Sequence, residues 1–454
     1  MLKFIRRSTV EAPADEVFAW HERPGALQRL TPPFEDVELI ESSGGIKSGG
    51  TSMLEMKAGP STFHWLAQHV DYHENQMFSD IQLQGPFAYW KHTHTFKPQD
   101  GTSSVLEDKI EYILPAGLVS NLVVGRAIRR KLERVFSYRH KITQDDLALY
   151  LTYKGIKPMK ILVSGSSGLV GQALLPLLTT QGHEVTRLVR KKSETGIYWQ
   201  PDVNEIDVRA LEGFDAVIHL AGDNIADGRW TSEKKAKIRD SRIHGTKLLS
   251  QALAQLANPP KVLVSASAIG FYGPHGDESL DESAKAGDDF LAQVCRDWEA
   301  STQPAANKGI RVVNLRFGVI LSTKGGALAK MLPPFLMGAG GNLGSGRQVM
   351  SWVSLDDVLG SIYHCLVNET IHGPVNVTSP NPATNAEFTK ALGRVLHRPT
   401  VARVPSFGAR LLFGEMADAL LLSGARVLPA KLMETNYKFR HPDLEEALRF
   451  TLGK

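Results

Sequence analysis

Three glycines at three-residue spacing constrain the fold of this chain more than any other feature. Gly165, Gly168 and Gly171 follow the apolar run 161–163 and lead into the helix-prone segment 172–182. Such a run predicts a buried parallel strand that turns tightly into a helix. The first glycine permits the turn, the second lets the backbone approach a pyrophosphate, and the third lets helix and strand pack closely. We expect a dinucleotide to bind here with its phosphates at the helix N-terminus, the alternative being a turn that binds nothing.

The next predicted strand, 183–190, ends in a run of cations, Arg190, Lys191 and Lys192. A dinucleotide-binding fold that prefers NAD usually has an acidic residue there, which holds the ribose 2′-hydroxyl. Arg190 and Lys191 are instead suited to neutralise a 2′-phosphate, for which the guanidinium offers two parallel hydrogen bonds. The sequence therefore predicts NADP in preference to NAD, the alternative being an ordinary solvated strand end.

Buried strands recur along the middle of the chain. We expect them at 216–220, at 261–267 and at 310–321, each separated from the next by helical or small-residue segments. Repeated strand and helix units of this kind predict an α/β, doubly wound parallel sheet, with a ligand crevice at the carboxyl ends of its strands.

Residues 1–150 follow a different pattern. A strand at 2–10 and a helical segment precede a series of alternating runs punctuated by glycine, proline and asparagine, and a helix with apolar residues at three-and-four spacing closes the region. This order resembles the α+β helix-grip fold of the START-like and polyketide-cyclase-like superfamily, in which a curved sheet wraps the last helix. The resemblance implies a small apolar or amphipathic ligand. Periodicity is lost before Gly155, where we place a domain boundary.

Histidines in this first region invite a metal interpretation. His92 and His94 point to one face of a predicted strand, and His64, His69 and His73 are near them in sequence. No carboxylate or cysteine completes a recognisable ligand spacing, and two histidines on one strand face are more often exposed or hydrogen-bonded than ligating. We therefore expect no metal.

Composition excludes several classes of function. The 454 residues suggest two or three domains, and 42% hydrophobic and 22% charged residues without a sustained apolar span argue against a membrane protein. Two cysteines, Cys295 and Cys365, make no disulfide framework and favour a reducing cytoplasm. A net charge of +4 is too small over this length to indicate nucleic acid.

Six segments in order carry a second resemblance. SGSSGLVG, VIHLAG, SRIHGTKLL, SASAIGFYG, LRFGVIL and SWVSLDDV, within 164–358, are similar to an extended short-chain dehydrogenase/reductase of the NAD(P)-dependent epimerase type. The last eighty residues resemble the small C-terminal domain of unknown function found in an atypical branch of that family. The resemblance implies a Rossmann domain at 156–370 and a small, mostly helical C-terminal domain at 371–454 that covers a small-molecule substrate.

The resemblance also implies which residues contact the cofactor. They lie in the glycine turn, at the end of the second strand, and after three later strands: Gly165, Ser166, Ser167, Gly168, Leu169, Val170, Arg190, Lys191, Leu220, Ala221, Gly222, Ser265, Phe317 and Gly318.

The sequence departs from the family at the catalytic pair. The family uses a Tyr and, four residues on, a Lys, so that the ammonium lowers the pKa of the phenol. When Glu299 is aligned with the family's glutamate, Leu291 and Cys295 occupy these positions. The standard mechanism therefore does not transfer, and we expect Cys295 to be an inert core thiol.

Three other residues are catalytic candidates. Ser265 and Ser267 could orient a carbonyl, and Tyr272 could donate a proton, although a buried tyrosine beside a pocket is more often a packing residue with a satisfied hydroxyl. A NADP-dependent oxidoreductase or epimerase-like enzyme and a non-catalytic NADP-binding module both remain open.

The glycine-rich loop 338–352 supplies substrate-side candidates. Loops of this composition lie close to a ligand or move over it. Arg347 would hold an anionic group, and Ser351 and Trp352 would line the pocket. A surface arginine and a core tryptophan are the alternatives.

Overall fold

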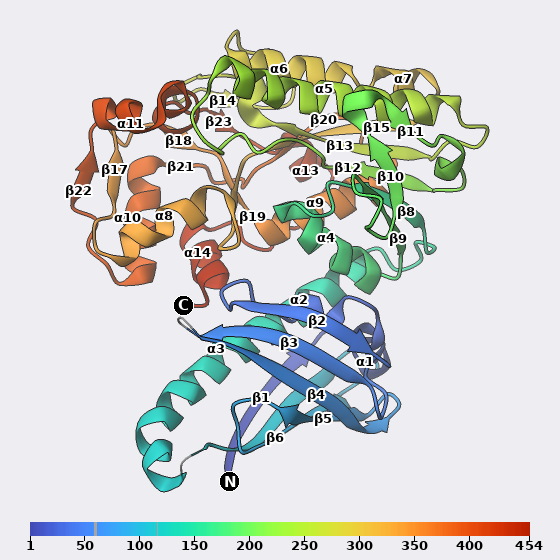
Figure 1. The fold of residues 1–454 in the computed structure, drawn as a ribbon, viewed down its shortest axis with the longest axis vertical. Coiled ribbons are helices and arrows are strands. Elements are labelled where there is room, and N and C mark those ends of the chain that lie inside the picture. Colours follow the sequence, from blue (N-terminus) through green and yellow to red (C-terminus); the bar gives the residue numbers. More distant parts are fainter. Residues whose placement is uncertain (59–60, 116) are drawn as a thin grey trace. The chain divides into compact units, whose positions relative to one another are not determined.

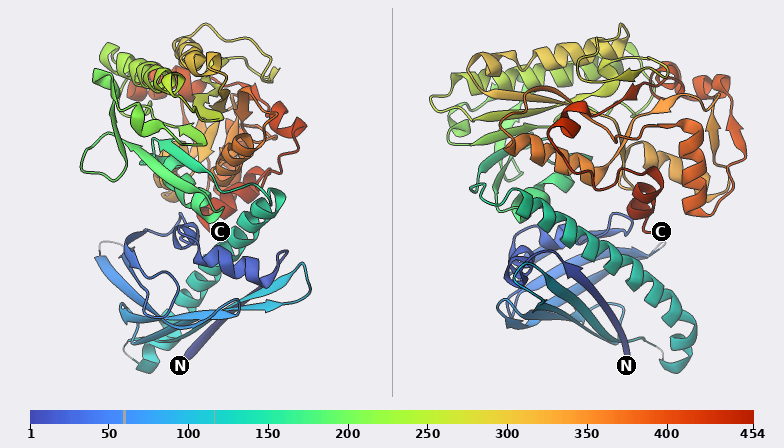
Figure 2. Two further views of the ribbon diagram at one scale, coloured as in Figure 1. Left: turned by 90° about the vertical axis from the view of Figure 1, so that its right-hand side faces the viewer. Right: turned by 180° about the vertical axis from the view of Figure 1, so that it is seen from behind.

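The computed structural model describes residues 1–58, 61–115 and 117–454. They form two compact units, shown from three sides in Figures 1 and 2. One consists of Met1–Ile156 with Pro176–Gly182 and Gly453, and the other of Lys157–Leu175, His183–Leu452 and Lys454. No helix in the described part of the chain is both long enough and apolar enough to cross a membrane.

The N-terminal unit is a seven-stranded antiparallel sheet in the order β1-β7-β6-β5-β4-β3-β2, as the helix-grip resemblance predicted. Buried residues alternate with partly exposed ones along β6 and β7, so one face of the sheet is packed. The long helix α3 lies along this face, where the rings of Phe4 and Phe136 are 5.5 Å apart. The elements are β1 (Leu2–Val10), α1 (Ala14–Glu22), α2 (Ala26–Arg29), β2 (Val37–Ser43), β3 (Thr51–Ala58), β4 (Ser61–His73), β5 (Met77–Gln84), β6 (Tyr89–Pro98), β7 (Ser104–Ile113) and α3 (Gly117–Thr152).

The second unit contains an eight-stranded sheet in the order β11-β10-β9-β8-β12-β13-β15-β20. Every strand pair is parallel except β10 with β11, which confirms the doubly wound prediction. Figure 1 shows α5, α6 and α7 on one face and α4 and α9 on the other. The elements to β15 are β8 (Lys160–Ser164), α4 (Leu169–Thr180), β9 (Glu184–Val189), β10 (Ile197–Gln200), β11 (Glu205–Ile206), β12 (Ala216–His219), α5 (Ser232–Gln255), β13 (Val262–Ala268), β14 (Ser279–Leu280), α6 (Phe290–Ala300), α7 (Gln303–Asn307) and β15 (Arg311–Phe317), with short helices at Pro201–Val203, Arg209–Leu211 and Ile269–Phe271.

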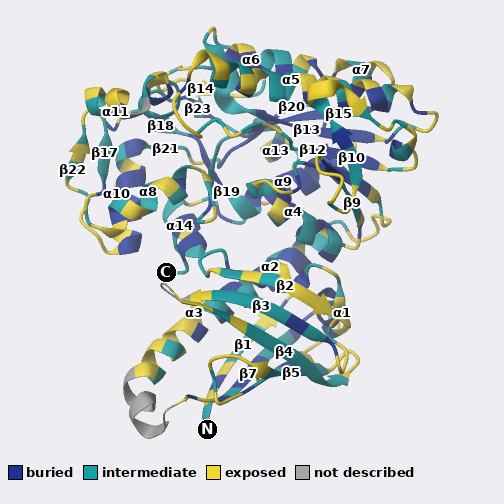
Figure 3. Cartoon of the chain, viewed as in Figure 1, coloured by how far each residue is buried: buried dark blue, intermediate teal, exposed yellow. Residues whose placement is uncertain are grey.

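Figure 3 shows that the central strands of this sheet are buried. Every residue of β12 is buried, and so are all residues of β13 and β15 except at strand ends, as the uninterrupted apolar runs predicted.

The C-terminal part adds mostly helices and several two-stranded pairs. A separate apolar core forms around Trp352, Phe388 and Leu392. The elements are β16 (Val319–Leu321), α8 (Gly326–Leu336), β17 (Gly341–Leu343), β18 (Val349–Met350), β19 (Trp352–Ser354), α9 (Leu355–Val367), β20 (Gly373–Val377), β21 (Ala383–Thr384), α10 (Asn385–Leu396), β22 (Ala402–Val404), α11 (Ser406–Phe413), α12 (Glu415–Ala417), a π-helical turn (Asp418–Leu422), β23 (Arg426–Val427), α13 (Ala430–Glu434) and α14 (Leu444–Leu452).

Candidate functional site

The glycine turn between β8 and α4 is packed too tightly for larger residues at two of its three positions. Gly165 has a φ of +69°, and a Cβ there would lie 2.6 Å from the carbonyl carbon of Leu220. A Cβ at Gly171 would lie 2.3 Å from the carbonyl oxygen of Gly165. Both positions therefore require glycine.

Gly168 is different because it is exposed and does not have a positive φ. A Cβ there would meet the carbonyl oxygen of Gly165 at 3.3 Å and no other described atom within 4 Å. The Gly168 backbone therefore faces open space beside the start of α4, where the N–H groups of the first helical turn lack partners within the helix.

The turn lies where the strand order of the sheet reverses. β8 pairs with β9 on one side and with β12 on the other, and the crevice of a doubly wound sheet forms at such a point. A buried chain of hydrogen bonds fixes the end of β8: Ser164 Oγ lies 2.6 Å from His219 Nδ1, and His219 Nε2 lies 3.0 Å from Thr246 Oγ1. Burial lowers the pKa of His219 to about 4, so this imidazole is neutral at physiological pH.

The predicted cofactor residues gather at this edge of the sheet. Leu220, Ala221 and Gly222 follow β12, and Phe317 and Gly318 end or follow β15. Ser167 is exposed in the turn, whereas Ser166 is buried, and Leu169 and Val170 are half-buried at the start of α4. Contact of any of them with a cofactor stays a prediction.

The cations at the end of β9 include one that the sequence analysis missed. Arg190 and Lys191 are exposed just beyond the strand. Arg187, within β9, donates from Nε to Ser166 Oγ at 3.0 Å and from Nη2 to Glu194 at 2.9 Å. These bonds hold the guanidinium of Arg187 against the glycine turn. The sequence did not indicate this contact, because Arg187 lies within the strand and not at its end.

The three catalytic candidates, Ser265, Ser267 and Tyr272, are buried. Ser265 and Tyr272 have no exposed surface, and Ser267 is 2% exposed. Ser267 Oγ donates to Glu299 at 2.7 Å. Tyr272 donates its hydroxyl proton to Asn376 Oδ1 at 2.7 Å and accepts a hydrogen bond from Arg316 at 2.9 Å.

This satisfied hydroxyl favours a structural role for Tyr272 in the state observed. Burial raises its pKa above the ordinary phenol value, which opposes ionisation. An acid/base role for Tyr272 stays a prediction that requires the Asn376 contact to break.

We expect Tyr272→Phe to lower the free energy of unfolding by about 1–3 kcal/mol, because Asn376 and Arg316 would each lose a buried partner. Urea unfolding followed by circular dichroism measures the change. Tyr89→Phe, at a 40% exposed tyrosine, is the matched control and should leave stability unaltered. Equal stability of Tyr272→Phe and wild type would contradict this role.

Leu291 and Cys295, at the positions of the family's Tyr and Lys, pack against the short helix Ile269–Phe271. A Cβ on Gly270 would lie 3.3 Å from Leu291 Cβ and 3.8 Å from Cys295 Sγ. Burial raises the pKa of the Cys295 thiol to about 12, so the thiol is protonated and unreactive at neutral pH. Leu291 thus has no ionisable group, and Cys295 carries no charge that could lower the pKa of a neighbouring phenol.

C-terminal residues cover the region beside Leu291. Met416 joins Trp230 and Ile238 in an apolar cluster, against which Phe290 and Leu291 pack. Lys235 also forms an ion pair of 2.7 Å with Glu415. The C-terminal part therefore packs against the start of α6, and its role as a lid over a substrate stays a prediction.

The substrate-side candidates occupy three different environments. Ser351 is 1% exposed, accepts from the Val427 amide at 2.9 Å and donates to the Ala425 carbonyl at 2.7 Å. Trp352 is fully buried, and its indole donates to the Asn381 carbonyl at 3.0 Å. Arg347 is exposed. The contacts of Ser351 and Trp352 favour core packing, and a substrate role for the three residues stays a prediction.

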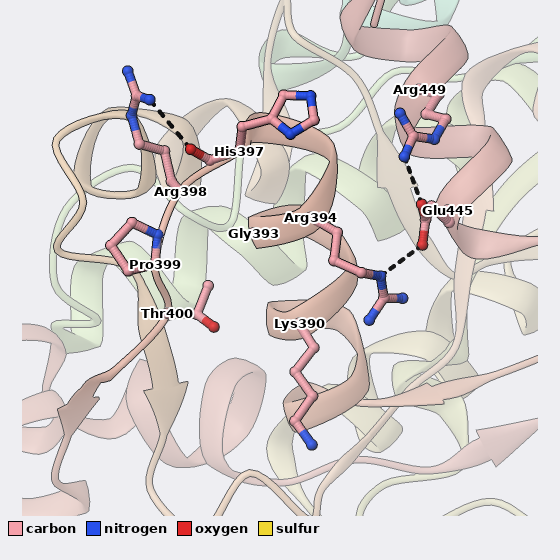
Figure 4. Close-up of a pocket in the computed structure, with 9 residues that line it drawn as sticks. All are labelled: Lys390, Gly393, Arg394, His397, Arg398, Pro399, Thr400, Glu445 and Arg449. Carbon is pink, nitrogen blue, oxygen red and sulfur yellow. Dashed lines mark hydrogen bonds and ion pairs between the residues drawn. The ribbon is translucent and has the colours of Figure 1, made fainter.

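Figure 4 shows an open groove elsewhere on this unit. Its lining comes from α10, the segment after it and α14: Lys390, Gly393, Arg394, His397, Arg398, Pro399, Thr400, Glu445 and Arg449. Arg394 and Arg449 both bind Glu445, at 2.8 and 2.7 Å. None of these residues belongs to the glycine turn or to the carboxyl ends of the parallel strands.

Family models match three consecutive parts of the chain. The model described as polyketide cyclase / dehydrase and lipid transport matches residues 10–136, the NAD dependent epimerase/dehydratase family matches 161–378, and a domain of unknown function matches 404–451. An epimerase family protein of Mycobacterium bovis is 45% identical over 292 residues, which is 64% of this chain and 96% of that protein. This chain belongs to the epimerase family.

Solved structures of this epimerase family cover the same parts. The crystal structure of a nucleoside-diphosphate sugar epimerase from Corynebacterium glutamicum matches with a TM-score of 0.81 and 33% identity, covering 99% of this chain and 90% of that one. The human epimerase family protein SDR39U1, crystallised with NADPH, matches with a TM-score of 0.61 and 35% identity, covering 65% of this chain and 99% of that one. The first of these relatives therefore spans both units, and the second spans the epimerase region.

Proposed function

We propose that this epimerase-family protein binds NADP(H) at the glycine turn and transfers hydride between the nicotinamide and a small-molecule substrate held beneath the C-terminal lid. The observation that carries the proposal is the unobstructed Gly168 backbone, at the edge of the sheet where the neighbouring strand β9 ends in exposed cations. The human relative crystallised with NADPH supports the same cofactor.

The residues present fit this cofactor. The free N–H groups at the start of α4 would bind the pyrophosphate over Gly168. Exposed Arg190 and Lys191 would bind the 2′-phosphate, and Arg187 would order the turn through Ser166. When bound, NADPH supplies hydride chemistry, and the protein orients it and keeps water out.

A non-catalytic NADP-binding module is the second candidate. It is favoured by Leu291, which offers no proton at the position of the family's Tyr, and by Cys295, whose thiol is uncharged at the position of the Lys. The full chain incubated with NADPH and a panel of aldehydes and ketones distinguishes the two, because consumption of NADPH is followed by its absorbance. If Tyr272 is the donor, Tyr272→Phe abolishes any turnover found.

Arg190→Asp tests the cofactor assignment without a substrate. We expect wild type to bind NADPH roughly 10–100-fold more tightly than NADH, since charge-assisted hydrogen bonds contribute about 1.5–3 kcal/mol. Arg190→Asp should remove that preference in calorimetric titrations.

Lys308→Asp is the control for this substitution. Lys308 is equally exposed but precedes β15 at the amino end of its strand. The Lys308→Asp variant should therefore keep the wild-type preference for NADPH over NADH. Equal affinity of wild type for both cofactors would contradict the assignment.

A further inference from the structure

The packed face of the N-terminal sheet carries four polar side chains that the strand register brings together. Asp80 on β5 lies directly opposite His92 on β6, and His94 on β6 lies directly opposite Asp108 on β7. His92, His94 and Asp108 are at most 6% exposed. Ionisable groups are buried together in this way only where they pair with one another or with a bound ion.

Three of these residues converge as a set of ligands would. Asp80, His92 and His94 each offer one ligand atom, and these atoms all lie within 4.8 Å of one another. They come from two adjacent strands, so the ladder of backbone hydrogen bonds holds them in place. A site on strands is positioned more firmly than one on loops.

Asp108 orients the two imidazoles rather than completing the set. Its Oδ1 lies 2.9 Å from His92 Nε2, which leaves His92 Nδ1 facing Asp80 Oδ2 at 3.5 Å. Its Oδ2 lies 2.7 Å from Nε2 of His140 on α3, and the other nitrogen of His140 lies 2.9 Å from Ser8 Oγ. Metal-ligating histidines are commonly oriented in this way by a carboxylate on the second ring nitrogen.

His94 supplies an independent observation. Its Nδ1 is buried and lies 2.6 Å from Asp108 Oδ1, yet no described group bonds to it with hydrogen-bond geometry. A buried polar atom without a satisfactory hydrogen bond is uncommon in a folded protein, and a bound ion is one way in which such an atom gains a partner.

We propose that Asp80, His92 and His94 bind one divalent transition-metal ion of the Zn²⁺ type. Two imidazoles and one carboxylate are a ligand set that Zn²⁺ accepts, and such a set leaves a coordination position open for an oxygen of a bound molecule. This site goes beyond the proposed function because it lies in the other compact unit. The proposal departs from the expectation of no metal, because Asp80, the carboxylate that completes the set, lies on the neighbouring strand β5 and forms no recognisable ligand spacing with His92 and His94 in the sequence.

The test uses the full-length protein stripped with EDTA and dialysed against Zn²⁺ alone. We expect about one Zn²⁺ per chain by mass spectrometry, and a rise in the thermal unfolding midpoint on Zn²⁺ addition, because an ion that binds only the folded state stabilises it. Asp80→Asn and His94→Gln keep the size of each side chain and should weaken Zn²⁺ binding by at least about tenfold.

His64→Gln is the matched control, because His64 lies on β4 with a side chain that is 51% exposed and should not affect binding. Co²⁺ in place of Zn²⁺ should give a visible absorption spectrum in wild type and in His64→Gln only. Circular dichroism checks that every variant folds. Absence of Zn²⁺ uptake by stripped wild type would overturn the proposal, as would wild-type uptake by folded Asp80→Asn and His94→Gln; either result would make the cluster a buried hydrogen-bonded network.

Discussion

Arg316→Met is expected to lower the free energy of unfolding of the epimerase-family unit by about 3–5 kcal/mol. Arg316 is 3% exposed, and its guanidinium makes two hydrogen bonds of 2.8 Å to the carboxylate of Glu299 and one of 2.9 Å to the Tyr272 hydroxyl. Without Arg316 the Glu299 carboxylate would keep only the hydrogen bond from Ser267 in this network. An uncompensated charge of this kind is the costliest consequence of breaking a buried ion pair.

Urea unfolding measures this loss of stability. Two further variants test whether the loss comes from the unpaired buried charge. Arg316→Met with Glu299→Leu removes both charges and should recover much of the lost stability, since apolar replacements of a buried pair are often neutral. Arg394→Met breaks an ion pair whose arginine side chain is 59% exposed, and it should cost at most about 1 kcal/mol. Similar losses for Arg316→Met and Arg394→Met would show that the buried pair is not structurally important.

Gly168→Ala is expected to reduce NADPH affinity by more than about 100-fold, which corresponds to about 3 kcal/mol. The fold should tolerate this methyl group, because its only close neighbour within the described structure is the Gly165 oxygen at 3.3 Å. The methyl group would instead occupy the space through which a pyrophosphate approaches the backbone. Calorimetric titration with NADPH measures the loss, and the thermal unfolding midpoint should stay near that of wild type.

Two other glycines make the contrast. Gly125→Ala, in α3, meets no atom of the described residues within 4 Å and should leave NADPH affinity unchanged. Gly165→Ala should destabilise the fold itself, because both the positive φ and the contact with Leu220 exclude a side chain. Wild-type NADPH affinity in folded Gly168→Ala would contradict a pyrophosphate site at this turn.

Local patterns in the sequence were sufficient for the fold. The apolar run before Gly165 and the later buried runs predicted the parallel strands β8, β12, β13 and β15, and the alternation of the first region predicted its antiparallel sheet. These features depend on residues adjacent in the chain, which is why periodicity reveals them. The family motifs then identified the epimerase region, which the relatives confirm.

Contacts between distant segments were not predictable in the same way. Arg187 on β9 contacts Ser166 after the adjacent strand β8, and Glu299 on α6 contacts Arg316 on β15. Asp80 meets His92 only because the β5–β6 register places them opposite each other. Such side-chain partners are set by how strands pair and how helices pack on them, and a single sequence does not show which distant residues these arrangements bring together.

A crystal structure of the full chain grown with NADPH tests binding at the glycine turn most directly. We predict density for the pyrophosphate over Gly168 at the start of α4, with the 2′-phosphate within hydrogen-bond distance of Arg190. NADPH bound instead in the groove of Lys390 and Arg394, or an empty glycine turn at saturating NADPH, would contradict it.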